Sequence, residues 1–288
     1  AIKMLRHFDA ATDAVVAKIN AYKESSASPE NPQDVTASFF DAYNFDDQNK
    51  GSWKSSTGAQ NNQASSTSGK LGNNTNFLEN WNGNPFSGKI YYEIENLPNG
   101  VYQFGLNVAL NGGEGYVYAN SSKKYVDSKN FAAEPFKVLA MVDSTKLECG
   151  LEIINNSSNW VGVDDAQLMY FGNSLESYQY WIKSVVDSAP DFEADGVYVQ
   201  KAALEAYKAV LTQAENMTSK EDIIAFIPTF TEALDVMTAN YNAYQAYQKT
   251  VQEVEQAFND EDLNGEVADE LGDYLIGYEE DILRAGEM

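Results

Sequence analysis

The spacing of apolar residues changes twice along this chain of 288 residues. Apolar side chains recur at steps of three and four in residues 2–22, alternate with polar ones in residues 34–172, and return to steps of three and four in residues 173–288. The first spacing places side chains on one face of a helix, whereas alternation places them on one face of a strand. The chain therefore predicts an N-terminal helix with a linker (residues 1–33), a β-domain and a C-terminal antiparallel helical bundle.

Turn-forming residues divide the β-region into about eight predicted strands. Residues 101–111 alternate most regularly, with apolar side chains at Tyr102, Phe104, Leu106, Val108 and Leu110. Further strands are predicted at residues 89–95, 116–119, 136–142, 147–154 and 161–171. Residues 54–80 are mostly Ser, Thr, Asn, Gln and Gly, which predicts a long irregular loop. Many strands with turns between them and no helices predict an antiparallel β-sandwich.

The C-terminal third predicts five amphipathic helices. Their apolar positions run through residues 175–189, 203–214, 223–237, 244–258 and 267–278. Pro228 falls inside the third helix and is expected to kink or restart it. Similar segments open at Tyr178 and Tyr244, which indicates a faint repeat consistent with a three-helix module whose second copy is incomplete.

The charge balance excludes some partners. Lys and Arg number 19 against 43 Asp and Glu, for a net charge of −24 at pH 7. A surface this acidic repels phosphate backbones and anionic lipids. The sequence also lacks the run of about 18 apolar residues that a membrane-spanning helix needs. We therefore expect neither nucleic-acid binding nor membrane insertion.

Few residues are available for the common catalytic chemistries. The chain has one histidine, His7, and one cysteine, Cys149, whose apolar surroundings predict a core position. Two such residues are too few for a zinc site, and His-dependent nucleophilic catalysis would need His7 beside a nucleophile. The sequence thus predicts a non-catalytic protein. A pair of carboxylates that hydrolyses a glycosidic bond remains an alternative.

Two adjacent acids, Asp164 and Asp165, interrupt the last predicted strand. Neighbouring residues on a strand point to opposite faces, so at least one of the two starts out on an apolar face, where a bare carboxylate is costly. A Ca²⁺ ion, a lysine or backbone N–H groups could compensate, and the turn with Asp46 and Asp47 could supply further oxygens to Ca²⁺. Alternatively, Asp164 and Asp165 cap a turn.

Several aromatic residues lie in polar surroundings, where a flat apolar ring beside amides suits a sugar. Trp81 occurs in ENWNGN and Trp160 in NNSSNW, while Trp53 is a further candidate. Each loop tryptophan could instead cap the end of the core. The predicted carbohydrate-contact residues are Trp81, Asn82, Tyr116, Tyr118, Asn156 and Trp160.

Three segments carry a family resemblance: YNFDD followed by GSW at residues 43–53, LPNGVYQF at residues 97–104 and NWVGVDDAQLMYFG at residues 159–172. Together they resemble the galactose-binding-like jelly-roll domains found among carbohydrate-binding modules. In that family an acid of the last strand helps to hold a structural Ca²⁺ with the acidic turn after the first strand. The resemblance therefore implies metal ligands at Asp165 or Asp164 and at Asp46 or Asp47.

The Tyr-rich, acidic helices are similar to three-helix modules of the FIVAR type, and the combination resembles surface proteins of gut bacteria that handle glycans. This resemblance implies a non-catalytic carbohydrate-binding module on helical spacers, in an extracellular or cell-surface bacterial protein whose signal sequence lies outside this chain. A structural or adhesive surface protein that binds no small ligand, and a fragment of a glycoside hydrolase, remain alternatives.

Overall fold

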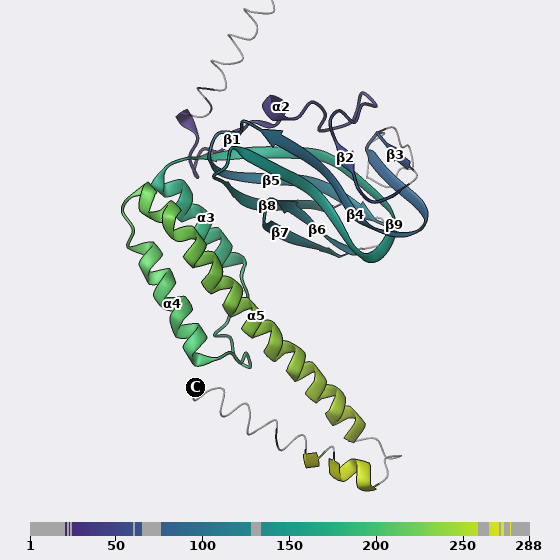
Figure 1. The fold of residues 1–288 in the computed structure, drawn as a ribbon, viewed down its shortest axis with the longest axis vertical. Coiled ribbons are helices and arrows are strands. Elements are labelled where there is room, and N and C mark those ends of the chain that lie inside the picture. The colour runs from purple at the N-terminus through teal and green to yellow at the C-terminus, as the bar shows by residue number, and fades with distance from the viewer. Residues whose placement is uncertain are drawn as a thin grey trace, which may run out of the picture. The chain divides into compact units, whose positions relative to one another are not determined.

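The computed structural model describes residues 21, 23, 25–59, 61–64, 76–127, 134–258, 265–270, 272, 273 and 277. The chain divides into two compact units, Ala1–Ser184 and Val185–Met288 (Figure 1). All the described strands lie in the first unit, which also contains α2 and most of α3, whereas the described elements of the second unit are helices. The helix predicted at residues 2–22 and most of the one predicted at residues 267–278 lie outside the described residues.

All strand pairs in the first unit are antiparallel. In chain order the elements are β1 (Gln33–Asp34), α2 (Thr36–Phe39), β2 (Lys54–Ser55), β3 (Asn61–Gln63), β4 (Leu78–Glu95), β5 (Gly100–Leu110), β6 (Glu114–Ala119), β7 (Ser122–Asp127), β8 (Glu134–Val142) and β9 (Lys146–Gly172). Strand β7 was not expected from the sequence, and β2 and β3 fall where a long loop was predicted.

The two longest strands, β4 and β9, run side by side through both layers of a sandwich (Figure 1). The second half of β4 pairs with the first half of β9, which has β6 on its other side. Beyond a register shift, the first half of β4 pairs with the second half of β9, which has β5 on its other side. We call the two resulting layers the β6 layer (β2, β4, β9, β6 and β7) and the β5 layer (β3, β4, β9, β5 and β8, with β1 on the edge of β9).

A bend inside β9 lets one strand serve both layers. Asn155 and Asn156 adopt φ values of 58° and 46°, in the left-handed region that asparagine tolerates better than most residues. The sequence had suggested a loop at residues 155–160, and this prediction was wrong, because β9 is continuous from Lys146 to Gly172. The asparagines turn the strand without ending it.

Alternating side chains from the two layers fill one core, as the sequence pattern predicted. The buried residues include Ile90, Val117, Leu147, Cys149 and Leu151 from the β6 layer and Phe104, Leu106, Val108, Val163 and Leu168 from the β5 layer. The predicted β-sandwich is thereby confirmed. Cys149 lies in this core, where burial raises the pKa of its thiol and keeps it protonated.

An aromatic cluster closes the core beside the segment between α2 and β2. Trp53 is 2% exposed, its Nε1 donates to the Ala42 carbonyl oxygen at 2.8 Å, and its ring contacts Phe40, Phe45 and Tyr92. Trp53 is therefore a core residue, and its candidacy for sugar stacking was wrong.

The first turns of α3 (Leu175–Ser188) belong to the first unit. Ser177 is fully buried and its Oγ donates to the Phe171 carbonyl oxygen at 2.8 Å, while Tyr180 stacks on Phe171 with ring centroids 5.2 Å apart. The compact unit accordingly runs to Ser184, beyond the boundary predicted at residue 172.

In the second unit, α4 (Lys201–Glu215) packs antiparallel to α5 (Lys220–Phe258) (Figure 1). The Gln200 N–H donates to Asn240 Oδ1 at 2.8 Å, and Tyr207 and Met237 are buried between the helices. The prediction of separate helices at residues 223–237 and 244–258 was wrong, because α5 continues through both and through Pro228. No helix among the described residues is long and apolar enough to cross a membrane.

Candidate functional site

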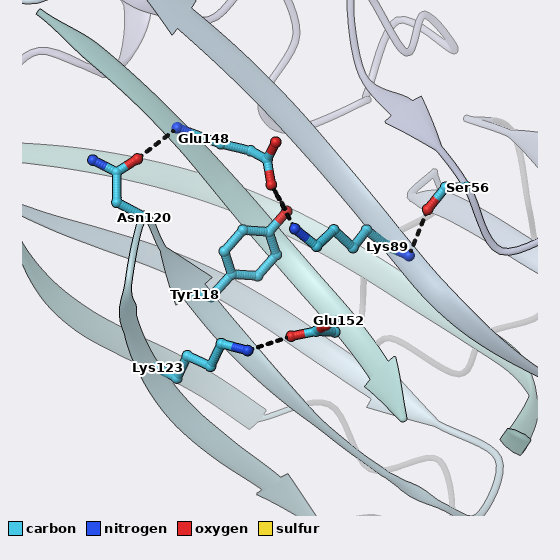
Figure 2. A network of polar contacts seen from close by, with 7 residues as sticks. All are labelled: Ser56, Lys89, Tyr118, Asn120, Lys123, Glu148 and Glu152. Atoms are coloured by element: carbon cyan, nitrogen blue, oxygen red, sulfur yellow. Dashed lines mark hydrogen bonds and ion pairs between the residues drawn. The ribbon is translucent and has the colours of Figure 1, made fainter. Parts of the chain in front are cut away.

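The outer face of the β6 layer carries a network of ion pairs that includes Tyr118 (Figure 2). Lys89 Nζ lies 2.8 Å from Glu148 Oε1, and Tyr118 Oη donates to the same oxygen at 2.9 Å. The bond from Lys89 holds the pKa of Glu148 below its usual value, and the same bond raises the pKa of Lys89. A second pair joins Lys123 to Glu152 at 2.6 Å. The charges on this part of the face are therefore mutually compensated.

The same network covers the two tyrosines that were predicted to contact sugar. Tyr118 is 2% exposed, and Lys89 Nζ lies 4.8 Å from its ring centroid. Burial, followed by the bond to Glu148, raises the pKa of the Tyr118 hydroxyl. The Tyr116 ring has Lys123 Nζ 5.3 Å from its centroid and the edge of another tyrosine against it. The structure contradicts a stacking role for Tyr118. The Tyr116 ring is partly covered by Lys123 and Tyr125, which leaves less of its surface for a sugar.

Trp81 and Trp160 are cross-strand partners between β4 and β9. Directly opposed residues project from the same face of a sheet. Because the next residue, Val161, points into the core, both rings lie on the outer face of the β5 layer. Their exposure differs sharply: Trp81 is 44% exposed and Trp160 is 3% exposed. All four tryptophans are described, and the other three are at most 7% exposed, so Trp81 alone presents its ring to solvent.

Trp160 is held in place by contacts within the protein. Its Nε1 donates to Glu79 Oε1 at 2.7 Å, and its ring meets Phe77 edge-on with centroids 6.0 Å apart. Phe77, Ala109 and Trp160 form a small buried cluster. The prediction that Trp160 stacks on a sugar was therefore wrong, because the ring is covered and its only polar atom is bonded within the protein.

Polar residues occupy neighbouring positions on the face that carries Trp81. Gln63 of β3 is the register partner of Glu79, which places both on the outer face beside Trp81. The Asn111 N–H donates to the Trp160 carbonyl oxygen at 3.0 Å at the end of β5. We call this surface (Gln63, Glu79, Trp81, Asn111 and Trp160) the Trp81 face. It combines one flat apolar ring with amide and carboxylate groups.

The remaining predicted contact residues are divided between regions. Asn82 follows Trp81 in β4 and is half-buried. Asn156 lies at the bend of β9, where its Oδ1 accepts a hydrogen bond from Ser87 Oγ at 2.9 Å. The structure thus brings Trp81, Asn82 and Trp160 together and places Tyr116 and Tyr118 on the other layer. The role of Glu79 as hydrogen-bond acceptor for Trp160 was missed, because the sequence does not show that β4 pairs with β9 in the register that brings the two residues together.

The acidic turn predicted to bind metal is organised by local bonds. Asp46 Oδ2 accepts from Asn44 Nδ2 at 2.8 Å, and Asp47 Oδ1 accepts from the Asn49 N–H at 3.0 Å. Both carboxylates are exposed. Each acid therefore shapes the turn that carries it.

The two acids of β9 occupy different environments. Asp164 is 1% exposed, and its Oδ1 accepts the Asp165 N–H at 2.8 Å. Asp165 has a φ of 47° at a bulge, and its Oδ2 accepts from Asn107 Nδ2 at 2.9 Å. The described residues contain no group of three or more His, Cys, Asp or Glu that could hold a metal. A Ca²⁺ ion at Asp164 would therefore require main-chain or amide oxygens as its other ligands.

No protein-family model and no curated protein sequence matches this chain. Solved structures similar to part of it include carbohydrate-binding modules. TmCBM61 in complex with β-1,4-galactotriose is 15% identical, with 46% of this chain and 97% of that chain covered and a TM-score of 0.38. The CBM22-1 xylan-binding domain of Paenibacillus barcinonensis Xyn10C is 12% identical, with 45% and 92% covered and a TM-score of 0.31.

Proposed function

We propose that the β-sandwich is a non-catalytic carbohydrate-binding module that contacts its glycan through the Trp81 face. The observation that carries this proposal is the exposure of Trp81, 44% against at most 7% for the other tryptophans. An indole ring offers a large apolar surface that is usually covered in a folded protein. Its position beside Gln63 and Glu79 suits a ligand that has both an apolar ring face and hydroxyl groups, as a sugar has.

Rigidity of this surface favours binding. Trp81 lies on a strand rather than in a loop, and its cross-strand neighbour Trp160 is fixed by Phe77 and Glu79. A side chain that is held before the ligand arrives loses less conformational entropy on binding. The two tyrosines predicted to contact sugar on the β6 layer are less suited to this role, because Lys89 lies over the ring of Tyr118 and Lys123 over the ring of Tyr116.

Replacing Trp81 with alanine is expected to weaken glycan binding at least about tenfold, because the stacking surface is removed. The whole chain would first be applied to a glycan array, followed by calorimetric titration with β-1,4-galactotriose and xylohexaose. Tyr125→Ala is the matched control, because Tyr125 is 48% exposed on the β6 layer and its loss should leave binding unchanged. A chain that binds no glycan on the array, or a Trp81→Ala variant that binds as tightly as the parent, contradicts the proposal. The structural or adhesive alternative would then be favoured.

The predicted structural Ca²⁺ has a test of its own. If the ion binds the folded sandwich at Asp164, excess CaCl₂ over EGTA should stabilise the protein by about 2.7 kcal/mol at a concentration one hundred times the Kd. The measurement is thermal unfolding followed by tryptophan fluorescence, with Asp164→Asn expected to abolish the shift and MgCl₂ as the ionic control. Equal melting temperatures in CaCl₂ and EGTA would refute the prediction. The cell-surface location and the FIVAR-like character of the helices also stay predictions.

A further inference from the structure

A groove of about 700 Å³ lies on the outer face of the β5 layer, separate from the Trp81 face. Its floor is Gly105 in the middle of β5, flanked by its register partners Lys137 of β8 and Gln167 of β9. The Trp81 face reaches β5 only at Asn111, six residues further along the chain. At about 3.3 Å per strand residue, the two places are about 20 Å apart on one sheet.

The packing around Gly105, which lies next to the register shift between β5 and β9, leaves room for a side chain. Gly105 has an extended backbone paired on both sides, a setting in which glycine costs about 0.5–1 kcal/mol relative to alanine. A Cβ atom added there would meet Gln167 Cβ at 3.6 Å and Lys137 Cγ at 3.8 Å, which are ordinary van der Waals distances. Neither the backbone nor the packing therefore requires the missing side chain. Its absence keeps the floor of the groove open, as glycines do where a ligand approaches a strand closely.

The walls combine an aromatic surface with hydrogen-bonding groups. Tyr43 supplies the aromatic surface at the rim, where it is 37% exposed. Asn107 and Asp165 are bonded to each other at 2.9 Å, which fixes both side chains at the groove. A ring face next to fixed amide and carboxylate groups is the combination that recognises sugar hydroxyls.

The charge of the groove selects against strongly charged ligands. Among its described lining residues, two lysines (Lys23 and Lys137) offset two aspartates (Asp34 and Asp165). This balance differs from the chain as a whole, which carries a net charge of −24. An uncharged polar ligand meets neither net repulsion nor an uncompensated buried charge there. The volume lies within the range of about 300–1,000 Å³ that small-molecule sites occupy.

We propose that this groove is a second carbohydrate-binding site, which takes an uncharged sugar unit over Gly105 and against Tyr43. The inference rests on the proposed function, because it assumes that the sandwich binds glycans. It adds a site that is independent of Trp81: no residue that lines the groove belongs to the Trp81 face. A glycan-binding sandwich of this kind has two contact points on one face.

The test is calorimetric titration of the whole chain with β-1,4-galactotriose and with xylohexaose, using Gly105→Leu to fill the floor. We expect the affinity at the groove to fall at least about tenfold while the Trp81 face still binds. Tyr43→Ala should weaken the same site, and it keeps the test informative if Gly105→Leu fails to fold. Gly105→Ala should retain the melting temperature of the parent, which checks that the strand accepts a side chain.

The outcomes separate the two proposals. Loss of one binding event in Gly105→Leu and of the other in Trp81→Ala supports both sites. Parent-like binding by both Gly105→Leu and Tyr43→Ala, with loss in Trp81→Ala, overturns the groove and leaves the proposed function standing. Loss in Gly105→Leu with none in Trp81→Ala supports the groove and overturns the Trp81 face.

Discussion

Replacing Trp160 with alanine is expected to lower the free energy of unfolding of the sandwich by about 3–5 kcal/mol. Replacing its cross-strand partner Trp81 should change that free energy by only about 0.5 kcal/mol. The reason is burial: Trp160 is 3% exposed in a cluster with Phe77, whereas Trp81 is 44% exposed. Loss of the Trp160 ring leaves a cavity and also removes the donor that Glu79 accepts from.

Urea unfolding followed by tryptophan fluorescence measures this contrast. All four tryptophans lie in the first compact unit, so the fluorescence reports on that unit and not on the helices of the second. Trp160→Phe is the intermediate control, because it keeps an aromatic ring but loses the hydrogen bond to the half-buried Glu79, a loss of about 1 kcal/mol. Equal destabilisation by Trp81→Ala and Trp160→Ala would mean that Trp81 is part of the core. The Trp81 face would then lose its basis as a contact surface.

The sandwich could be predicted because its signal is local. Alternation along β5 and β9 places Phe104, Leu106 and Leu168 on one side of each strand, and these residues are all buried. The bend in β9 could not be predicted in this way. Asn155 and Asn156 form an ordinary turn sequence, and only pairing with distant residues of β4 keeps the chain extended on both sides of them.

The continuous helix α5 shows a different limit. Its two halves were assigned to separate helices although the spacing of apolar residues continues from Met237 through Tyr241 to Tyr244 at steps of four and three. The intervening residues contain no glycine or proline to end a helix. The unbroken spacing of apolar residues is therefore consistent with the single helix α5.

The candidate sites depend on contacts between distant segments. Trp81 could be identified from its polar surroundings, but the burial of Trp160 depends on Phe77 and Glu79, whose positions follow from the β4–β9 register. The groove gave no sequence signal, because Tyr43, Gly105, Lys137 and Gln167 come from four separate parts of the chain. Strand register brings three of them into one row, and no local pattern encodes that register.

Replacing Gly150 with alanine is expected to lower the free energy of unfolding by about 3 kcal/mol, near the upper end for overpacking. Gly150 lies in β9 between Tyr91 of β4 and Tyr118 of β6. A Cβ atom there would overlap the main-chain oxygen of Ile90 and come within 2.8 Å of Tyr91 Cα. These are backbone atoms of a paired strand, so they can move only if the β4–β9 ladder is disturbed.

Gly105→Ala is the matched comparison, because it adds the same methyl group to another paired strand of the same sandwich. Its Cβ atom would meet no atom closer than 3.6 Å, so the variant should be as stable as the parent or more stable by up to about 1 kcal/mol. Urea unfolding by tryptophan fluorescence gives both values under one condition. Similar losses in the two variants would mean that the β5 layer also needs a glycine for packing, and the argument for the groove from its open floor would fail. A large loss of unfolding free energy in Gly150→Ala with none in Gly105→Ala would show that Gly150 is needed for the close approach of β4 to β9. It would also support the proposal that Gly105 keeps the groove open for a ligand.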